Sequence, residues 1–243
     1  MRTKKNEYKK YSKDEERQLL ASLAEQLRVP IVQMARLSEE DSKKNRKTIA
    51  AISRTANELI DAYQLVLQLH MQEGALHVEP VSLSALLHKT AQKTQRLAEE
   101  YRCDVQIDTK GSYEPVLINT EIIEAALSAL SSVFIIESKV FGADTARSSR
   151  PIVTLAAHRS RWGLVVGAYS SNTSMNNATY GRAKNLYGKA RQPFNHIFTS
   201  AGAGVFIANA LLAMAACNLH ASRYHNMTGL AVTLKPASQL SLV

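Results

Sequence analysis

The first third of the sequence carries two long series of apolar residues, spaced by three and four positions. This spacing places the apolar side chains along one face of a helix and predicts two amphipathic helices, one starting at Ser12 and one over about residues 47–73. A polar stretch over residues 38–47 predicts the turn between them. The series are Leu20, Leu23, Leu27, Ile31, Met34 and Leu37, then Ile49, Ile52, Ala56, Leu59, Tyr63 and Val66. The sequence therefore predicts a helical hairpin over residues 12–75, after a disordered basic tail over residues 1–11.

A single helical hairpin leaves an apolar seam uncovered on each of its helices. Two hairpins that pack side by side cover both seams in a four-helix bundle. We therefore expect a homodimer. Pro30 lies inside the first helix, where its ring removes a hydrogen bond at a cost of roughly 3 kcal/mol, so this helix is expected to be kinked.

The pattern changes after Gly74, and residues 76–243 predict a second domain. Helical spacing is found over residues 82–101, 120–137 and 203–216. Strand-like runs occur at residues 104–108 and 115–119, on both sides of a turn at 158–161, and in a hairpin turning near 227–229. Residues 171–200 are expected to form a long loop. The fold class is therefore α+β, a dimeric helical bundle followed by three helices on a mostly antiparallel sheet.

No Lys, Arg, Asp or Glu occurs between Arg191 and Arg223, which raises the question of a membrane span. The central part of this segment is rich in Ala and Gly and contains Asn209, so it is weakly hydrophobic compared with a leucine-rich span. A buried helix is therefore favoured over a membrane-spanning one.

The composition limits the partners and the compartment. The formal net charge is +9, which indicates either a solvated basic surface or attraction to an acidic partner. Cys103 and Cys217 are far apart and form no Cys-x-x-Cys motif, so neither a zinc site nor a disulfide framework is predicted. The polar N-terminus does not resemble a signal peptide. A cytoplasmic location is expected.

Four stretches, in this order, resemble the catalytic core of sensor histidine kinases. "LLASLAEQLRVPI" is similar to the first dimerisation helix, and "VEPVSLSALLHKTAQKTQRLAEEYRCDVQID" to the start of the ATPase-like domain. "PVLINTEIIEAALSALSSV" resembles the helix that carries the N box, and "QPFNHIFTSAGAGVFIANALLAMA" the F box and the second glycine box. The resemblance covers residues 12–236. It implies an ATPase-like sandwich that binds Mg²⁺ and ATP, a phosphoacceptor histidine and a response-regulator partner.

The sequence departs from this pattern at the positions that carry the chemistry. The phosphoacceptor position falls on Glu25, and the asparagine that would hold Mg²⁺ falls on Val133, which offers no oxygen ligand. The aspartate that would bind adenine falls on Ala168. Further departures are Ala129 in the N box, Ser170 and Asn172 at glycine positions of the first glycine box, and Phe206 in the second.

These departures lead to the hypothesis of a pseudokinase, a catalytically inactive dimeric scaffold without a cofactor that regulates a response regulator, a kinase or another assembly. Glu25, Arg28, Arg36, Lys43 and Lys44 are the candidates for partner binding.

Three alternatives remain open. The first is a divergent, active ATP-dependent kinase or phosphotransferase, and the second is a basic nucleic-acid-binding module driven by the +9 charge, for which no motif is found. The third is association of the uncharged segment 192–222 with a membrane surface. Bound ATP with Mg²⁺ is disfavoured. The residues that remain for a weak anion site are Gly202, Gly204, Lys189 and Arg191, because glycine lets backbone approach a phosphate closely.

Overall fold

The computed structural model describes residues 24, 27–28, 31–32, 34–39, 42–71, 77–109, 111–142, 150–171 and 198–237. The described positions between 24 and 37 are helical, and helix α2 spans Lys43–Met71. Ser42 begins α2, because its side-chain oxygen accepts the backbone N–H of Asn45 at 3.1 Å. The predicted turn over residues 38–47 extends too far, because residues 43–47 belong to α2. The pairing of two such hairpins into a bundle stays a prediction.

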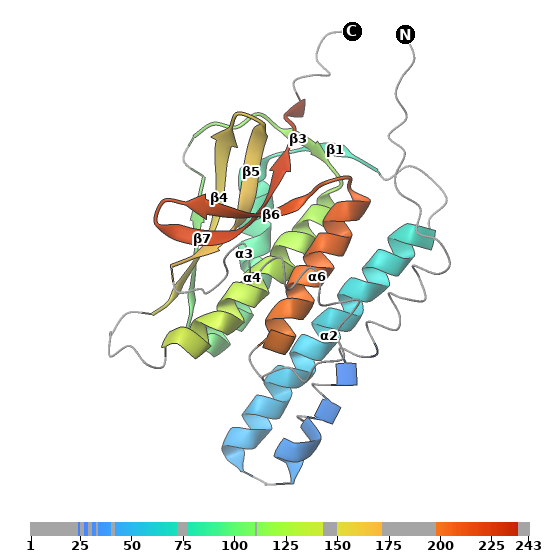
Figure 1. The fold of residues 1–243 in the computed structure, drawn as a ribbon, viewed down its shortest axis with the longest axis vertical. Helices are drawn as coiled ribbons and strands as arrows, with labels where there is room; N and C mark the ends of the chain where they lie inside the picture. Colours follow the sequence, from blue (N-terminus) through green and yellow to red (C-terminus); the bar gives the residue numbers. More distant parts are fainter. Residues whose placement is uncertain are drawn as a thin grey trace.

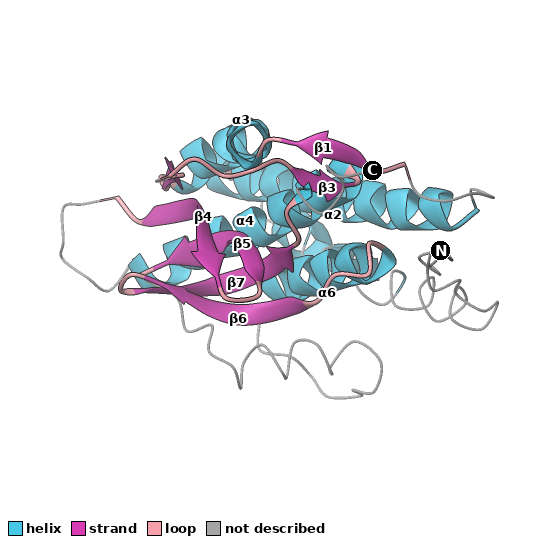
Figure 2. Cartoon of the chain, turned by 90° about the horizontal axis from the view of Figure 1, so that it is seen from above, coloured by secondary structure: helices cyan, strands magenta, loops and turns pink. Residues whose placement is uncertain are grey.

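The second domain is a sandwich of three helices on one five-stranded sheet (Figures 1 and 2). The helices are α3 (Leu83–Tyr101), α4 (Thr120–Gly142) and α6 (Phe198–Met214). The strand order is β2-β4-β5-β7-β6, with β2 (Asp104–Asp108), β4 (Ile152–Ser160), β5 (Gly163–Ser170), β6 (Leu219–Tyr224) and β7 (Met227–Leu234). The β2–β4 pair is parallel and the other pairs are antiparallel. The predicted mixed sandwich is thus confirmed.

Several predicted boundaries need correction. Residues 79–81, for which the sequence predicts no helix or strand, form strand β1 (Glu79–Val81), which pairs with β3 (Val116–Ile118) in a small second sheet. The last hairpin turns at residues 225–226, before the predicted position, since Tyr224 pairs with Met227. Helix α4 continues to residue 142 because its second half also packs into the core, which the hydrophobic period alone did not locate.

Asn119 connects residue His77 to the start of α4 by hydrogen bonds. Its side-chain oxygen accepts the backbone N–H of Ile122 at 2.9 Å and so caps the helix, while its amide nitrogen donates to the carbonyl of His77 at 2.9 Å. Thr120 donates to the Glu79 carboxylate at 2.6 Å. The start of α4 is thereby tied to the strand that follows the helical region.

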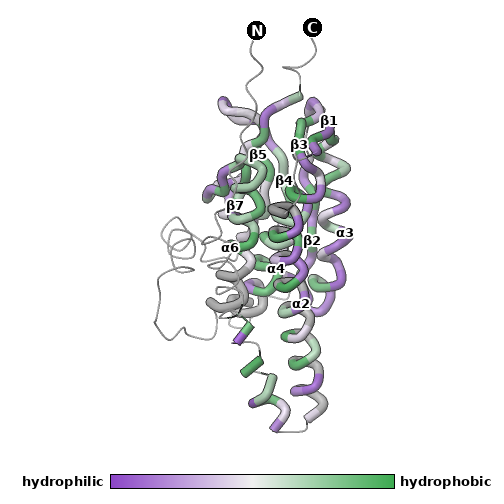
Figure 3. The backbone as a smooth tube through the Cα atoms, turned by 90° about the vertical axis from the view of Figure 1, so that its right-hand side faces the viewer, coloured by the Kyte–Doolittle hydropathy of each residue, from purple (hydrophilic) through white to green (hydrophobic). Residues whose placement is uncertain are grey.

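The main core lies between the sheet and its three helices. The inner face of the sheet presents buried aliphatic side chains such as Leu155 and Val166, and α4 and α6 cover them with Leu130 and Leu211. Figure 3 shows the apolar segments running through this layer. Helix α6 is buried along most of its described side chains, which confirms the buried helix predicted for the uncharged segment. Within the described residues, no helix is long and apolar enough to cross a membrane.

Helix α2 packs against α6 within one chain. Tyr63 of α2 is 2% exposed and belongs to the core of the sandwich domain, and Ala56 is 8% exposed. Both were assigned from the sequence to the seam of a dimeric bundle. Part of that seam is therefore covered by the chain's own second domain, which periodicity cannot distinguish from a partner.

A second, smaller cluster covers the opposite face of the sheet. Tyr169 of β5 lies over Gly229 of β7, where an added Cβ would be 2.6 Å from the ring. The ring centroids of Tyr169 and Tyr224 are 5.4 Å apart, and His158 lies 5.4 Å from Tyr224. Strand β7 pairs with β5 and β6 pairs with β7, so the β6–β7 hairpin brings Tyr224 into the same cluster as Tyr169.

Candidate functional site

Val133, the position that the resemblance assigns to Mg²⁺, lies against α6, and we define the α4–α6 seam as Ala129, Val133 and Gly204. Val133 is 1% exposed, and Ala168 and Leu230 are fully buried. Ala168 lies on β5 directly between Leu155 of β4 and Leu230 of β7. Val133 and Ala168 are therefore both part of the hydrophobic core, and Val133 lies against Gly204.

Gly204 sets the distance between α4 and α6. A Cβ added to it would approach Cγ2 of Val133 closer than 3.0 Å and the carbonyl oxygen of Ala129 to 3.1 Å. The two helices can lie this close only because residue 204 has no side chain. In this structure the missing side chain of Gly204 allows close approach of helix α4.

Gly202 and Gly204 both lie inside α6, which begins at residue 198. The backbone N–H groups left free by a helix are those of its first four residues, so the N–H groups of these glycines fall beyond that set. Lys189 and Arg191, the basic partners expected for an anion, lie outside the described residues.

The side chains of the α4–α6 seam are apolar and provide no ligand atom for a cation. Hard cations such as Mg²⁺ need oxygen ligands, and neither Ala129 nor Val133 has a side-chain oxygen. Among the residues that the structure describes, no three His, Cys, Asp or Glu side chains gather in a way that could hold a metal ion. What the described seam does chemically is to exclude water and pack α4 against α6 and β5.

A charged cluster on the same helix was missed from the sequence. Glu124 of α4 is 2% exposed, and its carboxylate pairs with Lys89 at 2.6 Å and with Lys93, both on α3. Burial alone raises the pKa of Glu124, but hydrogen bonds from the two lysines outweigh it and lower the pKa below its usual value. The signal was the four-residue spacing of the lysines, which puts both on one face of α3.

The helical region presents some of the predicted partner-binding residues. Arg28 and Arg36 are exposed. The exposed fractions of Ile31 and Val32, on the same segment, are 56% and 43%. Glu25 lies outside the described residues. Lys43 and Lys44 form the first turn of α2, and their side chains are not among those described.

No protein-family model matches the sequence, and no curated protein sequence matches it. Solved structures do match. A histidine kinase of Acinetobacter baumannii, AdeS, is similar with a TM-score of 0.58 at 12% identity, over 87% of this chain and 97% of that one. Full-length ShkA in complex with AMPPNP is similar with a TM-score of 0.56 at 15% identity, over 91% of this chain and 46% of that one. Histidine kinase ThkA in complex with the response regulator TrrA gives 0.55 at 13% identity, over 90% and 62%.

The chain therefore has the fold of a histidine-kinase catalytic core, as the sequence motifs predicted. The hypothesis that the chain is not an enzyme is contradicted, because the matched structures are histidine kinases, which are enzymes. The substitutions at positions 129, 133 and 168 show which familiar side chains are missing. They do not show that the chain is inactive.

Proposed function

We propose that this chain acts in two-component-type signalling and binds the receiver domain of a response regulator through its helical region. The observation that supports this most directly is the fold shared with ThkA, a histidine kinase whose solved complex contains the response regulator TrrA. The match extends over 90% of this chain, which includes the helical region as well as the sandwich.

The charge of the helical region supports the same proposal. Arg28 and Arg36 are exposed on its first segment, and the chain as a whole carries +9. Receiver domains are acidic around the aspartate that is phosphorylated. Complementary charge of this kind speeds encounter and fixes orientation.

We also propose that two chains pair through their helical regions. Ile31 and Val32 leave apolar surface exposed on the first segment, and Ile49 and Ile52 of α2 are only partly buried within one chain. A second copy of the hairpin would cover both. Size-exclusion chromatography with light scattering tests this directly, and a monomer at micromolar concentration would contradict it. A cytoplasmic location is proposed with it, since Cys103 and Cys217 are both free thiols.

Nucleotide is not required for partner binding in this proposal. Val133 and Ala168, where the resemblance would place the Mg²⁺ and adenine contacts, are buried apolar side chains, so we expect receiver affinity to be the same with and without Mg²⁺ and ATP.

Calorimetry against a panel of purified receiver domains tests the function. The charge reversals Arg28→Glu and Arg36→Glu should together weaken binding by about tenfold or more. Arg96→Glu is the matched control, because Arg96 is equally exposed but lies on α3, away from the helical region. If no receiver binds, or if the Arg96 variant loses as much affinity as the double reversal, the proposal is wrong.

An ATP-dependent kinase or phosphotransferase is the second candidate, favoured by the fold, because the matched ShkA structure contains AMPPNP. Incubation with γ-labelled ATP and Mg²⁺, with and without the receiver that binds best, tests it. Label on either protein would establish phosphoryl transfer. If neither protein is labelled and ATP binding gives no heat, only the receiver-binding function remains as the proposal.

A further inference from the structure

The turn between β4 and β5 presents the most exposed large apolar side chain of the described residues. Trp162 is the single tryptophan of the sequence and is 73% exposed. We call residues 160–163 the β4–β5 tip. A single exposed apolar side chain is common on protein surfaces, so the groups around this ring decide whether it marks a contact site.

The β4–β5 tip is held in one conformation. The hydroxyl of Ser160 accepts the backbone N–H of Trp162 at 3.1 Å and donates to the carbonyl of Gly163 at 3.1 Å. Gly163 has φ of +136°, and a Cβ there would lie 2.5 Å from the carbonyl oxygen of Leu234. Only glycine fits, so the turn is fixed against the end of β7. The turn is already ordered in the folded protein, so binding through Trp162 loses little further conformational entropy.

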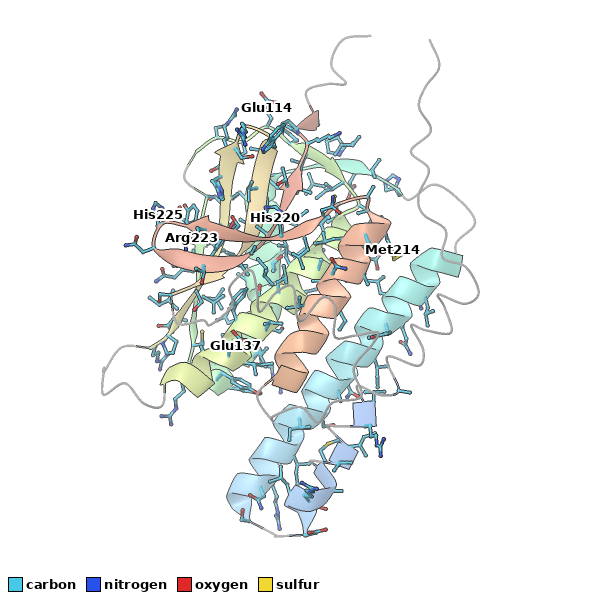
Figure 4. The ribbon with its side chains drawn as sticks, viewed as in Figure 1. Glu114, Glu137, Met214, His220, Arg223 and His225 are labelled. Carbon is cyan, nitrogen blue, oxygen red and sulfur yellow. The ribbon has the colours of Figure 1, made fainter. Side chains whose placement is uncertain are left out.

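One cation contacts the exposed ring and another lies nearby in the sequence. The guanidinium carbon of Arg161 lies 4.8 Å from the centroid of the Trp162 ring, and Arg159, two residues before Arg161, is exposed. Lys235 is exposed and directly follows Leu234, which abuts the tip. Glu114 lies at the same end of the sheet (Figure 4), and the charges of Asp108 and Arg159 both act on the Tyr113 hydroxyl. Among the described residues, three cations and two acids therefore lie at this end.

A second exposed apolar side chain, Leu117, lies beside Lys235. Val116 pairs with Pro236 in an antiparallel bridge, which sets Leu117 beside Lys235. Leu117 is 37% exposed. Leu117 thus lies beside Lys235, the residue that follows the strand against which the tip packs.

We propose that the β4–β5 tip is a peripheral contact site for an anionic lipid bilayer, with Trp162 inserted at the headgroup level. Tryptophan prefers this interface, where its ring is partly in hydrocarbon and its N–H remains hydrated. Lys and Arg are attracted to anionic headgroups while their aliphatic stems cover apolar surface. A two-residue turn is convex and suits a flat surface. Single-stranded nucleic acid is bound on several stacked aromatic rings, and the tip offers one.

The fluorescence of Trp162 tests the proposal, because no other tryptophan contributes to the signal. Addition of vesicles of mixed phosphatidylcholine and phosphatidylglycerol should shift the emission to the blue, and lipids with brominated acyl chains should quench it. Vesicles of phosphatidylcholine alone should do neither at the same concentration. Added salt should weaken the effect, since the attraction is between exposed charges.

Variants assign the effect to the tip by vesicle co-sedimentation. The pair Arg159→Gln and Arg161→Gln should reduce partition on the order of tenfold, and Trp162→Ala should reduce it as well. Arg96→Gln on α3 is the control with the same type of charge change. Urea unfolding verifies that each variant is folded. The proposal fails if anionic vesicles give no blue shift, if the control loses as much binding as the tip variants, or if an oligonucleotide or an acidic peptide changes the emission and vesicles do not.

Discussion

Gly204→Ala is the change that most directly tests how α4 and α6 are held together. The new Cβ would overlap Cγ2 of Val133 and lie 3.1 Å from the carbonyl oxygen of Ala129. Val133 is 1% exposed and its side chain is branched at Cβ, so it has little freedom to rotate away. The helices must therefore move apart, or the core must repack.

Two effects of opposite sign set the magnitude. Replacing glycine by alanine inside a helix stabilises it by roughly 0.5–1 kcal/mol. Inserting a methyl group into a packed core costs about 1–3 kcal/mol. The overlap involves a buried side chain and backbone, so we expect the second effect to prevail, with a net loss of about 1–2 kcal/mol. For a chain of 243 residues this corresponds to a fall in Tm of roughly 2–8 °C.

Urea unfolding followed by circular dichroism measures the loss, with an unchanged m-value showing that only stability has changed. Val133→Ala in the same background should relieve the overlap, because the added methyl group occupies the space vacated by Cγ2. The double variant should be more stable than the sum of the two single changes by about 1 kcal/mol or more. Asn209→Ala, also on α6, gains helix propensity without meeting Val133 and should be neutral or slightly stabilising.

A stabilised Gly204→Ala variant would refute the packing argument. So would strict additivity with Val133→Ala, since the two side chains would then not share one space. Either result would mean that α6 lies farther from α4 than described, and that the α4–α6 seam is open enough to admit a ligand.

Three further predictions follow from buried side chains. Tyr63→Ala should cost on the order of 3–5 kcal/mol and increase hydrogen exchange along α2, because the ring is 2% exposed in the core of the second domain; a loss below about 1 kcal/mol would argue against this docking. Glu124→Gln should destabilise the protein by about 1–3 kcal/mol at pH 7. The folded-state pKa of this carboxyl is lowered, so its contribution is present above the unfolded pKa of about 4.3 and is lost as the pH falls through the folded value; the difference from wild type in urea unfolding should shrink at pH 3. Burial and two neighbouring histidines lower the pKa of His158, so the unfolded chain binds its proton more readily and stability should decline as the pH falls below about 6.5. His158→Phe should flatten this part of the pH profile, and an unchanged slope would assign it to other groups.

The sequence by itself determined the order and type of most elements. The helical periods of α3 and α4, the alternation in β2 and the position of α6 follow from local spacing, and local spacing is set by which side chains face away from water. The family motifs then identified the fold, and solved structures confirm it at 12–15% identity.

Local patterns did not locate β1, because its three residues are defined by pairing with β3. The Glu124 cluster was also missed, since its lysines come from another helix.

Only the tertiary structure decided what the unusual positions do. From the sequence alone, Val133, Ala168 and Gly204 could only be compared with the motifs of histidine kinases. The absence of the usual Mg²⁺ and adenine ligands suggested an inactive protein. The fold shows instead that Val133 packs against Gly204, that Ala168 is buried in the sheet, that Tyr63 is covered by its own chain, and that Trp162 is held exposed on a fixed turn. Each of these facts depends on contacts between segments far apart in the chain. A sequence pattern records that a side chain is buried or exposed along one element, but the identity of its neighbours is fixed only when the elements pack.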